Sequence, residues 1–137
     1  MTDVHTVLVR SKNMRAIKGK NTKPELIVRR YLHAAGFRFR LHRKDLPGRP
    51  DIVLPKHRAV IFVHGCFWHR HPRCRFAVLP ATRPSFWLEK LQGNVARDEK
   101  QIAALESLGW RTFVIWECQA KNASVLEGVA QEIFGKG

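Results

Sequence analysis

The stretch between residues 51 and 63 constrains the fold of this chain more than any other. Two apolar runs, 51–54 and 59–63, are separated by the four residues PKHR. Two such runs joined by four turn residues predict a β-hairpin. All residues of 59–63 are apolar, which predicts a buried strand.

Helices are expected on both sides of this hairpin. Residues 22–25 (TKPE) are typical of a capping box with proline in the first turn, and the helix should end at Gly36. Alternating apolar and polar residues predict a half-exposed strand at 37–41. A helix over 85–108, either continuous or broken at Gly93-Asn94, a strand over 110–117 and a capped helix from Ser124 complete the pattern. We therefore expect an α/β fold of three layers, a small mixed sheet flanked by helices.

The length of 137 residues predicts one domain. We divide the chain into a basic N-terminal arm, 1–20, and a single domain, 21–137. No apolar run reaches the roughly 18–20 residues that span a bilayer, and the N-terminus lacks the apolar core of a signal peptide. Three cysteines do not make a disulfide framework. These features predict a soluble, intracellular protein of the cytoplasm.

Charge indicates the partner. The formal net charge is +14, and residues 1–50 carry 13 basic and 3 acidic residues, whereas residues 101–137 carry 3 and 4. A one-sided basic field attracts polyanions, of which DNA and RNA are the most common. An anionic membrane is the weaker alternative, because no segment is a basic amphipathic helix with a broad apolar face.

Five possible metal ligands lie within residues 64–74. A structural zinc site needs four nitrogen or sulfur ligands in a tetrahedron. Cys66, His71 and Cys74 supply three, and Cys118 completes the set if the strand before it lies beside the buried strand of the hairpin. The alternative is that Cys118 is a small buried apolar residue.

Asp51 is an isolated acid among basic neighbours at the start of a strand. A carboxylate in a basic groove can bind Mg²⁺ that bridges to phosphate oxygens. An ion pair with arginine, or an Asx turn, is the structural alternative. His64 and His69 should reach the same edge of the hairpin, where surplus histidines suggest proton transfer near a phosphate.

Six segments form a linked pattern over residues 9–120: SKNMRAI (11–17), LPGRPD (46–51), VIFVHGCFWH (60–69), FWLEK (86–90), NVARD (94–98) and GWRTFVIWEC (109–118). In this order and at this spacing they resemble the very-short-patch repair (Vsr) mismatch endonucleases. The resemblance implies a restriction-endonuclease-like core with a zinc-pinned loop. It further implies an enzyme that nicks one strand 5′ of the thymine in T·G mismatches, which arise when 5-methylcytosine deaminates. The expected enzyme is a monomer that acts on double-stranded DNA of a bacterial chromosome, with mismatch-repair proteins as partners implied by the family alone.

The resemblance also assigns roles to individual residues. Asp51 would hold Mg²⁺, helped by the main-chain carbonyl of Val63. His69 would be the general base, and His64 would assist at the phosphate. Glu25 would orient metal-bound water, although its place in the capping box explains it equally well.

The zinc set implied by the family matches the one counted from the residues. The DNA-facing residues include three large rings, which can act as wedges because unstacking costs less at a mismatch. A place in the core is their structural alternative. The three rings are Phe67, Trp68 and Trp87. On the arm, the apolar residues Met14 and Ile17 are similar to the family's minor-groove element. Elsewhere in the chain, Lys90 and Asn94 would face the DNA backbone or bases.

Two features depart from the expected pattern. Val63 stands where family members often have threonine, and the strand before His64 lacks the acidic residue and lysine usual in restriction-endonuclease-like folds. The expected mechanism is therefore histidine-assisted, Mg²⁺-dependent hydrolysis that leaves 3′-hydroxyl and 5′-phosphate ends. The alternatives are a restriction-type endonuclease that cuts intact duplex DNA and a zinc-stabilised DNA-binding module without catalysis.

Overall fold

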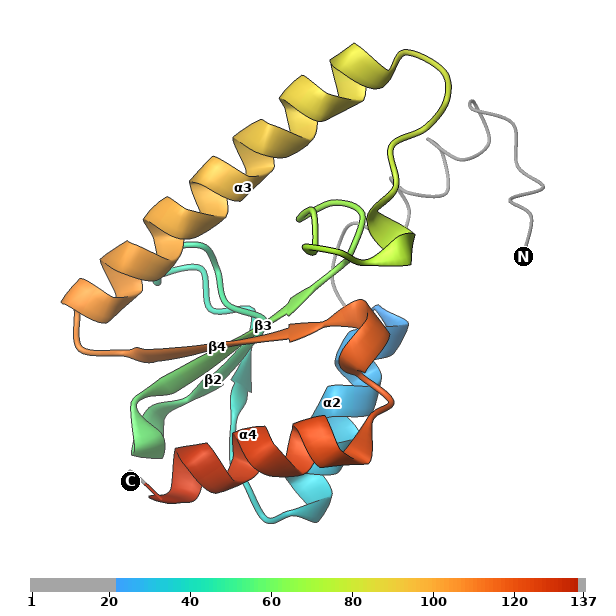
Figure 1. The fold of residues 1–137 in the computed structure, drawn as a ribbon. Helices are drawn as coiled ribbons and strands as arrows, with labels where there is room; N and C mark the ends of the chain where they lie inside the picture. Colours follow the sequence, from blue (N-terminus) through green and yellow to red (C-terminus); the bar gives the residue numbers. More distant parts are fainter. Residues whose placement is uncertain (1–21, 136–137) are drawn as a thin grey trace.

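A four-stranded mixed sheet forms the middle layer of the computed structural model, which describes residues 22–135 (Figure 1). Its strands are β1 (Arg40–Leu41), β2 (Ile52–Leu54), β3 (Ala59–His64) and β4 (Arg111–Trp116), paired in that order. The β1–β2 and β2–β3 pairs are antiparallel, and β3–β4 is parallel. The predicted hairpin is confirmed, with a 3₁₀ turn at Pro55–His57 between its strands.

Helices cover both faces of this sheet, as the sequence predicts. On one face, Ile61 and its neighbours pack against α2 (Lys23–Ala34) and α4 (Ala123–Gly135). On the other face, Val60 and Phe62 pack against Leu105 of α3 (Pro84–Ser107). Alternate residues of one strand thus enter opposite cores, because successive side chains of a strand point to opposite faces.

One local prediction was wrong, and one of two open alternatives is observed. The half-exposed strand expected over residues 37–41 is only two residues long. Its partner β2 has three residues, and the backbone of Phe37 is bonded to the end of α2 instead of to the sheet. The N–H of Phe37 donates to the Leu32 carbonyl, beyond Gly36, whose φ is +92°. Of the two alternatives for residues 85–108 the continuous helix is observed, since α3 runs unbroken through Gly93, where an added Cβ would meet no atom within 4 Å.

The parallel pairing of β3 with β4 places their carboxyl ends together, with His64 opposite Trp116. The loop after β3 and the 3₁₀ turn Glu117–Gln119 after β4 therefore start at the same edge of the sheet. This edge carries the candidate site. The arm 1–20, with Met14 and Ile17, lies outside the described residues, and within 22–135 no helix is long and apolar enough to cross a membrane.

Candidate active site and metal centre

Four cysteine and histidine side chains converge where β3 and β4 end. The ligand atoms of Cys66, His71, Cys74 and Cys118 all lie within 4.8 Å of one another. His71 Nδ1 is 3.7 Å from the sulfur of Cys66 and 3.4 Å from that of Cys118. The condition set by the sequence, that Cys118 reach this loop through a strand beside β3, is met.

These distances fit a tetrahedral zinc site. With Zn–S near 2.3 Å and Zn–N near 2.0–2.1 Å, sulfur and nitrogen ligands should lie roughly 3.5 Å apart. Burial raises the pKa of the Cys66 thiol to about 12 and also raises that of Cys118. Thiols of this kind stay protonated unless a cation replaces the proton, so the donor set suits a metal ion.

The surrounding residues fix the ligand geometry. The ring of His71 stacks on that of Trp116 with 4.2 Å between centres. Glu117 accepts a hydrogen bond from the Cys66 backbone N–H at 3.3 Å. The loop after β3 is thereby attached to the end of β4 even before a metal is considered.

The second cluster consists of His64, His69 and Asp98. His64 ends β3, His69 lies in the following loop, and their rings are parallel at 3.9 Å. Asp98, on α3, lies with Oδ2 2.5 Å from His69 Nδ1. Because Nδ1 is engaged, Nε2 of His69 is the ring atom that can take up a proton from a substrate.

His64 is buried, and this affects its charge. Burial, followed by the charge of the adjacent His69, lowers the pKa of His64 to about 4. His64 is therefore neutral at neutral pH and can offer an N–H donor without carrying a charge.

The third cluster consists of Glu25, His42 and Asp51. Asp51 Oδ2 accepts a hydrogen bond of 2.8 Å from the N–H of Val63, one residue before His64. Burial, and then the charge of Glu25, raises the pKa of Asp51 to about 6, although the Val63 bond opposes this. A buried pair of facing carboxylates is an arrangement that a divalent cation stabilises.

Glu25 has the capping contact expected of it, and its side chain belongs to the third cluster. Its backbone N–H donates to the hydroxyl of Thr22 at 3.4 Å, as in a helix cap. The residue is only 1% exposed, and its carboxylate accepts a hydrogen bond from Arg29 at 2.9 Å and lies 2.7 Å from His42 Nε2. The backbone caps α2 while the side chain enters the site.

Sequence reasoning missed Asp98 and His42. Asp98 closes the segment NVARD, and its position four residues after Asn94 on one helix face was the available signal. His42 is part of no sequence motif, because its partners Glu25 and Asp51 lie 17 and 9 residues away in the chain.

The aromatic residues form a small cluster of their own between the loop and α3. Phe67 and Trp87 are buried there with Leu91, while Trp68 is half-buried. Asn94 donates to the carbonyl of Trp68 at 3.1 Å, so in the free protein this side chain holds the loop against α3.

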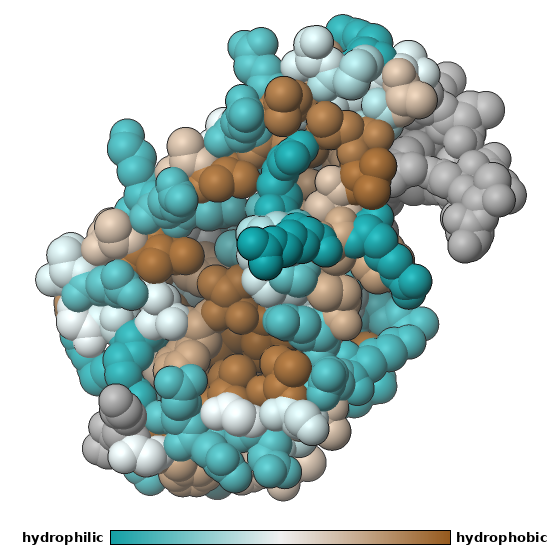
Figure 2. Space-filling model, in the orientation of Figure 1, coloured by the Kyte–Doolittle hydropathy of each residue, from teal (hydrophilic) through white to brown (hydrophobic). Residues whose placement is uncertain are grey.

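Basic and aromatic side chains alternate on the neighbouring surface. Phe76 and Phe86 are exposed, and arginines lie over both rings, Arg75 at 4.9 Å and Arg83 at 4.3 Å. Figure 2 shows hydrophobic side chains among hydrophilic ones over the upper part of α3. Lys90 of α3 is also exposed. Such a surface can contact both phosphates and bases.

The sequence matches the family model for DNA mismatch endonuclease Vsr over residues 2–75. The DNA mismatch endonuclease Vsr of Escherichia coli K12 is 48% identical over 143 residues, which cover 100% of this chain and 91% of that protein. The chain belongs to the Vsr family. As a Vsr-family protein, it is a DNA endonuclease.

Other Vsr-type relatives are nicking enzymes by name. A type II nicking enzyme of Xanthomonas oryzae pv. oryzae is 50% identical over 121 residues, 88% of each chain. Another, from Neisseria meningitidis serogroup A, is 45% identical over 125 residues, 91% of this chain and 89% of the relative. The family resemblance found in the sequence is thereby confirmed.

Proposed function

We propose that this chain nicks one DNA strand immediately 5′ of the thymine in a T·G mismatch and so starts short-patch repair. The observation that carries the proposal is the meeting of Asp51 with the stacked pair His64 and His69 at one sheet edge. Asp51 accepts a hydrogen bond from the N–H of Val63, the residue before His64, and His64 stacks on His69, so the three side chains gather at the end of β3. The Vsr family and the nicking relatives support the same reaction.

Asp51 would hold Mg²⁺ together with the main-chain carbonyl of Val63. The N–H and C=O of one strand residue project to the same side, and the Val63 N–H already meets Asp51. When bound, Mg²⁺ neutralises the developing charge on the phosphate and favours ionisation of the attacking water. Glu25 would orient that water from across the site.

His69 would accept the proton of the attacking water, and His64 would contact the phosphate. Water attacks phosphorus, and its proton moves to Nε2 of His69, whose Nδ1 is held by Asp98. The bond from phosphorus to the 3′ oxygen breaks, and that oxygen gains a proton to become the 3′-hydroxyl. The water oxygen remains on the 5′-phosphate. His64, neutral by burial, would donate a hydrogen bond to the phosphate.

Zinc, held by Cys66, His71, Cys74 and Cys118, would have a structural role in this scheme. The loop that carries His69 is largely without regular structure, so a metal that binds two residues further on would fix its path.

The rest of the chain would recognise DNA on a restriction-endonuclease-like core. The wedge would come from the small aromatic cluster, of which Trp68 is the accessible member and Phe67 and Trp87 would have to leave their packing. The proposed contacts to backbone, bases and minor groove are Lys90, Asn94, Met14 and Ile17. We propose a single domain, 21–137, with the arm 1–20, acting as a monomer on the bacterial chromosome alongside mismatch-repair proteins.

A nicking assay tests this function. End-labelled duplexes that differ only in one T·G or T·A pair are incubated with Mg²⁺ or without it. The proposal expects one cut, 5′ of the thymine, only at T·G and only with Mg²⁺. Equal cutting of the paired duplex indicates a restriction-type enzyme, and binding without cutting indicates a DNA-binding module.

A variant pair assigns the metal ligand. Asp51→Ala should abolish nicking and retain DNA binding, whereas Asp45→Ala, at an exposed carboxylate, should behave as wild type. Nicking by the Asp51 variant would exclude its role in holding Mg²⁺.

A further inference from the structure

His42 connects the two acidic residues of the candidate metal site. Its side-chain Nε2 lies 2.7 Å from Oε2 of Glu25, and its backbone N–H donates to the main-chain carbonyl of Asp51 at 3.1 Å. The ligand atoms of all three residues lie within 4.8 Å. His42 therefore links α2, which carries Glu25, to Asp51, the residue just before β2.

The backbone of His42 is in the left-handed region, with φ at 50°. This conformation is uncommon for residues with a side chain, and glycine or asparagine adopts it with less strain. A turn alone would not require an imidazole here. Strained residues of this kind concentrate at functional sites, where the surroundings hold them in place.

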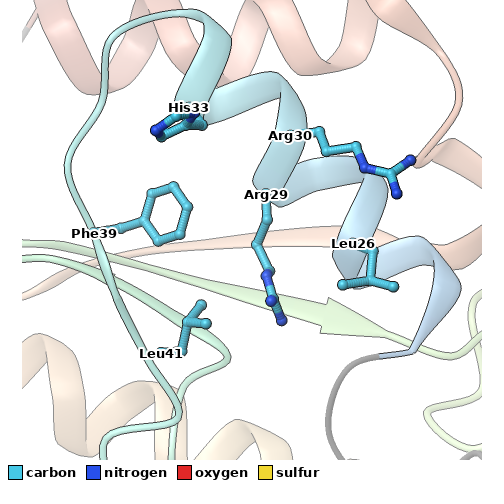
Figure 3. Close-up of a pocket in the computed structure, with 6 residues that line it drawn as sticks. All are labelled: Leu26, Arg29, Arg30, His33, Phe39 and Leu41. Atoms are coloured by element: carbon cyan, nitrogen blue, oxygen red, sulfur yellow. The ribbon is translucent and has the colours of Figure 1, made fainter.

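Glu25 has a second partner on its own helix. Arg29 donates to the same oxygen at 2.9 Å from the next turn of α2. In Figure 3 its side chain extends between Leu26 and Leu41, beside a pocket of about 310 Å³. Arg29 thus holds Glu25 from within α2, whereas His42 holds it from the segment whose backbone is bonded to Asp51.

We propose that His42 is a positioning residue that holds Glu25 against Asp51 and thereby sets the affinity of the site for a divalent cation. This inference rests on the proposed function, in which Asp51 holds the metal. Two facing carboxylates repel each other, so without His42 the Glu25 side chain turns toward Arg29 and away from the metal. Partners that orient metal-binding groups typically change metal affinity about 10–100-fold when they are removed.

The test compares His42→Asn, His42→Gln and His42→Gly in the full-length, zinc-loaded protein. Asparagine tolerates the left-handed backbone but is too short to reach Glu25, and glutamine restores the reach. Glycine removes the backbone strain and the side chain together, so it replaces the asparagine variant if that one fails to retain zinc. His33→Asn, at an exposed histidine of α2, is the matched control.

Mn²⁺ binding is measured without DNA by electron paramagnetic resonance, and the Mg²⁺ dependence of T·G nicking is measured separately. The asparagine and glycine variants should bind Mn²⁺ about 10–100-fold more weakly and need correspondingly more Mg²⁺ for half-maximal nicking. At saturating Mg²⁺ their maximal rate should return to near that of wild type. Glutamine should recover part of the affinity, and the His33 control should match wild type.

Unchanged Mn²⁺ affinity in both variants, or a nicking defect that Mg²⁺ does not restore, would overturn the role of His42. The same titration on Asp51→Ala separates this from failure of the proposed function. If Asp51→Ala abolishes Mn²⁺ binding and the His42 variants do not weaken it, only the positioning role is wrong. If Asp51→Ala also binds normally, the metal assignment itself is wrong.

Discussion

The ring of His64 lies parallel to the ring of His69, with 3.9 Å between centres and 6° between planes. Two imidazolium ions at this spacing would repel each other strongly, so the pair favours at most one proton. Asp98 stands beside His69, and His64 is the more buried partner. In the proposed mechanism the proton taken from the attacking water moves to His69, and the contact of Asp98 with Nδ1 of His69 supports that transfer.

Replacing Asp98 tests this assignment. Asp98→Asn keeps the size of the side chain but removes the charge that stabilises a protonated His69. We expect nicking of a T·G duplex to fall by about 10²–10⁴-fold, the usual contribution of general acid–base catalysis, with DNA binding unchanged. Glu99→Gln, at the next and exposed residue of α3, is the control. A nicking rate within a few fold of wild type would remove Asp98 from the mechanism.

Asp51 should destabilise the metal-free fold at neutral pH. Its pKa is raised from 3.8 to about 6, so between these values the folded state binds more protons than the unfolded state. The free energy of unfolding therefore falls as the pH rises through this range. We expect the stability advantage of Asp51→Asn over wild type to grow by about 2.5 kcal/mol from pH 4 to 7.5.

Urea unfolding in Mg²⁺-free buffer measures this difference. Loss of zinc at low pH affects both proteins alike and cancels in the comparison. Asp45→Asn serves as the control, because its hydrogen bond with Arg43 lowers the pKa of Asp45 and gives a dependence of opposite sign. A constant difference between wild type and Asp51→Asn across this range would show that Asp51 ionises freely in the folded protein.

The cysteine cluster should bind one zinc ion, and its loss should loosen the loop after β3. Cys118→Ser replaces the ligand contributed from beyond β4. We expect zinc content to fall from about one per chain to well below that, and the melting temperature to drop by at least several degrees. Elemental analysis and thermal unfolding measure both effects, with Lys121→Ala as a neighbouring exposed control. Full zinc retention by the serine variant would exclude Cys118 as a ligand.

The aromatic cluster predicts different effects for its members. Trp87 is 9% exposed, so Trp87→Ala should reduce stability by about 3–5 kcal/mol, as for other buried large rings. Trp68 is half-buried, so Trp68→Ala should change stability less than Trp87→Ala does. It should lower the preference for T·G over T·A about tenfold or more, because the unstacking that a wedge exploits is worth about a few kcal/mol per base step. Unfolding curves and nicking rates on both duplexes test this. Equal selectivity of wild type and Trp68→Ala would leave Trp68 with a packing role only.

The sequence predicted those parts of the fold that depend on local patterns. The hairpin, the start of α2 at Thr22 and its end at Gly36 follow from apolar runs and from residues with strong turn or cap preferences. The convergence of Cys118 with the other three ligands was also predictable, since it needed only one pairing of two strands.

Contacts between distant elements could not be predicted in this way. His42 lies in the site because its ring meets Glu25 of α2, 17 residues earlier in the chain, and Asp98 lies there because α3 continues unbroken past Gly93. The burial of Phe67 likewise depends on the packing of a loop without regular structure against a helix. Only Asp98 left a local signal, its place four residues after Asn94 on one helix face, and that spacing does not say which distant residue it meets.

In the loop after β3, two histidines with different partners are separated by a single residue. His69 turns to Asp98, and His71 turns to the cysteines, with Arg70 between them at a φ of 51°. An insertion or deletion at this point would exchange or misplace both rings at once. We therefore expect no insertions or deletions between these two histidines during evolution. An engineered change of loop length should be placed further along the chain, where the number of residues does not affect the position of either ring.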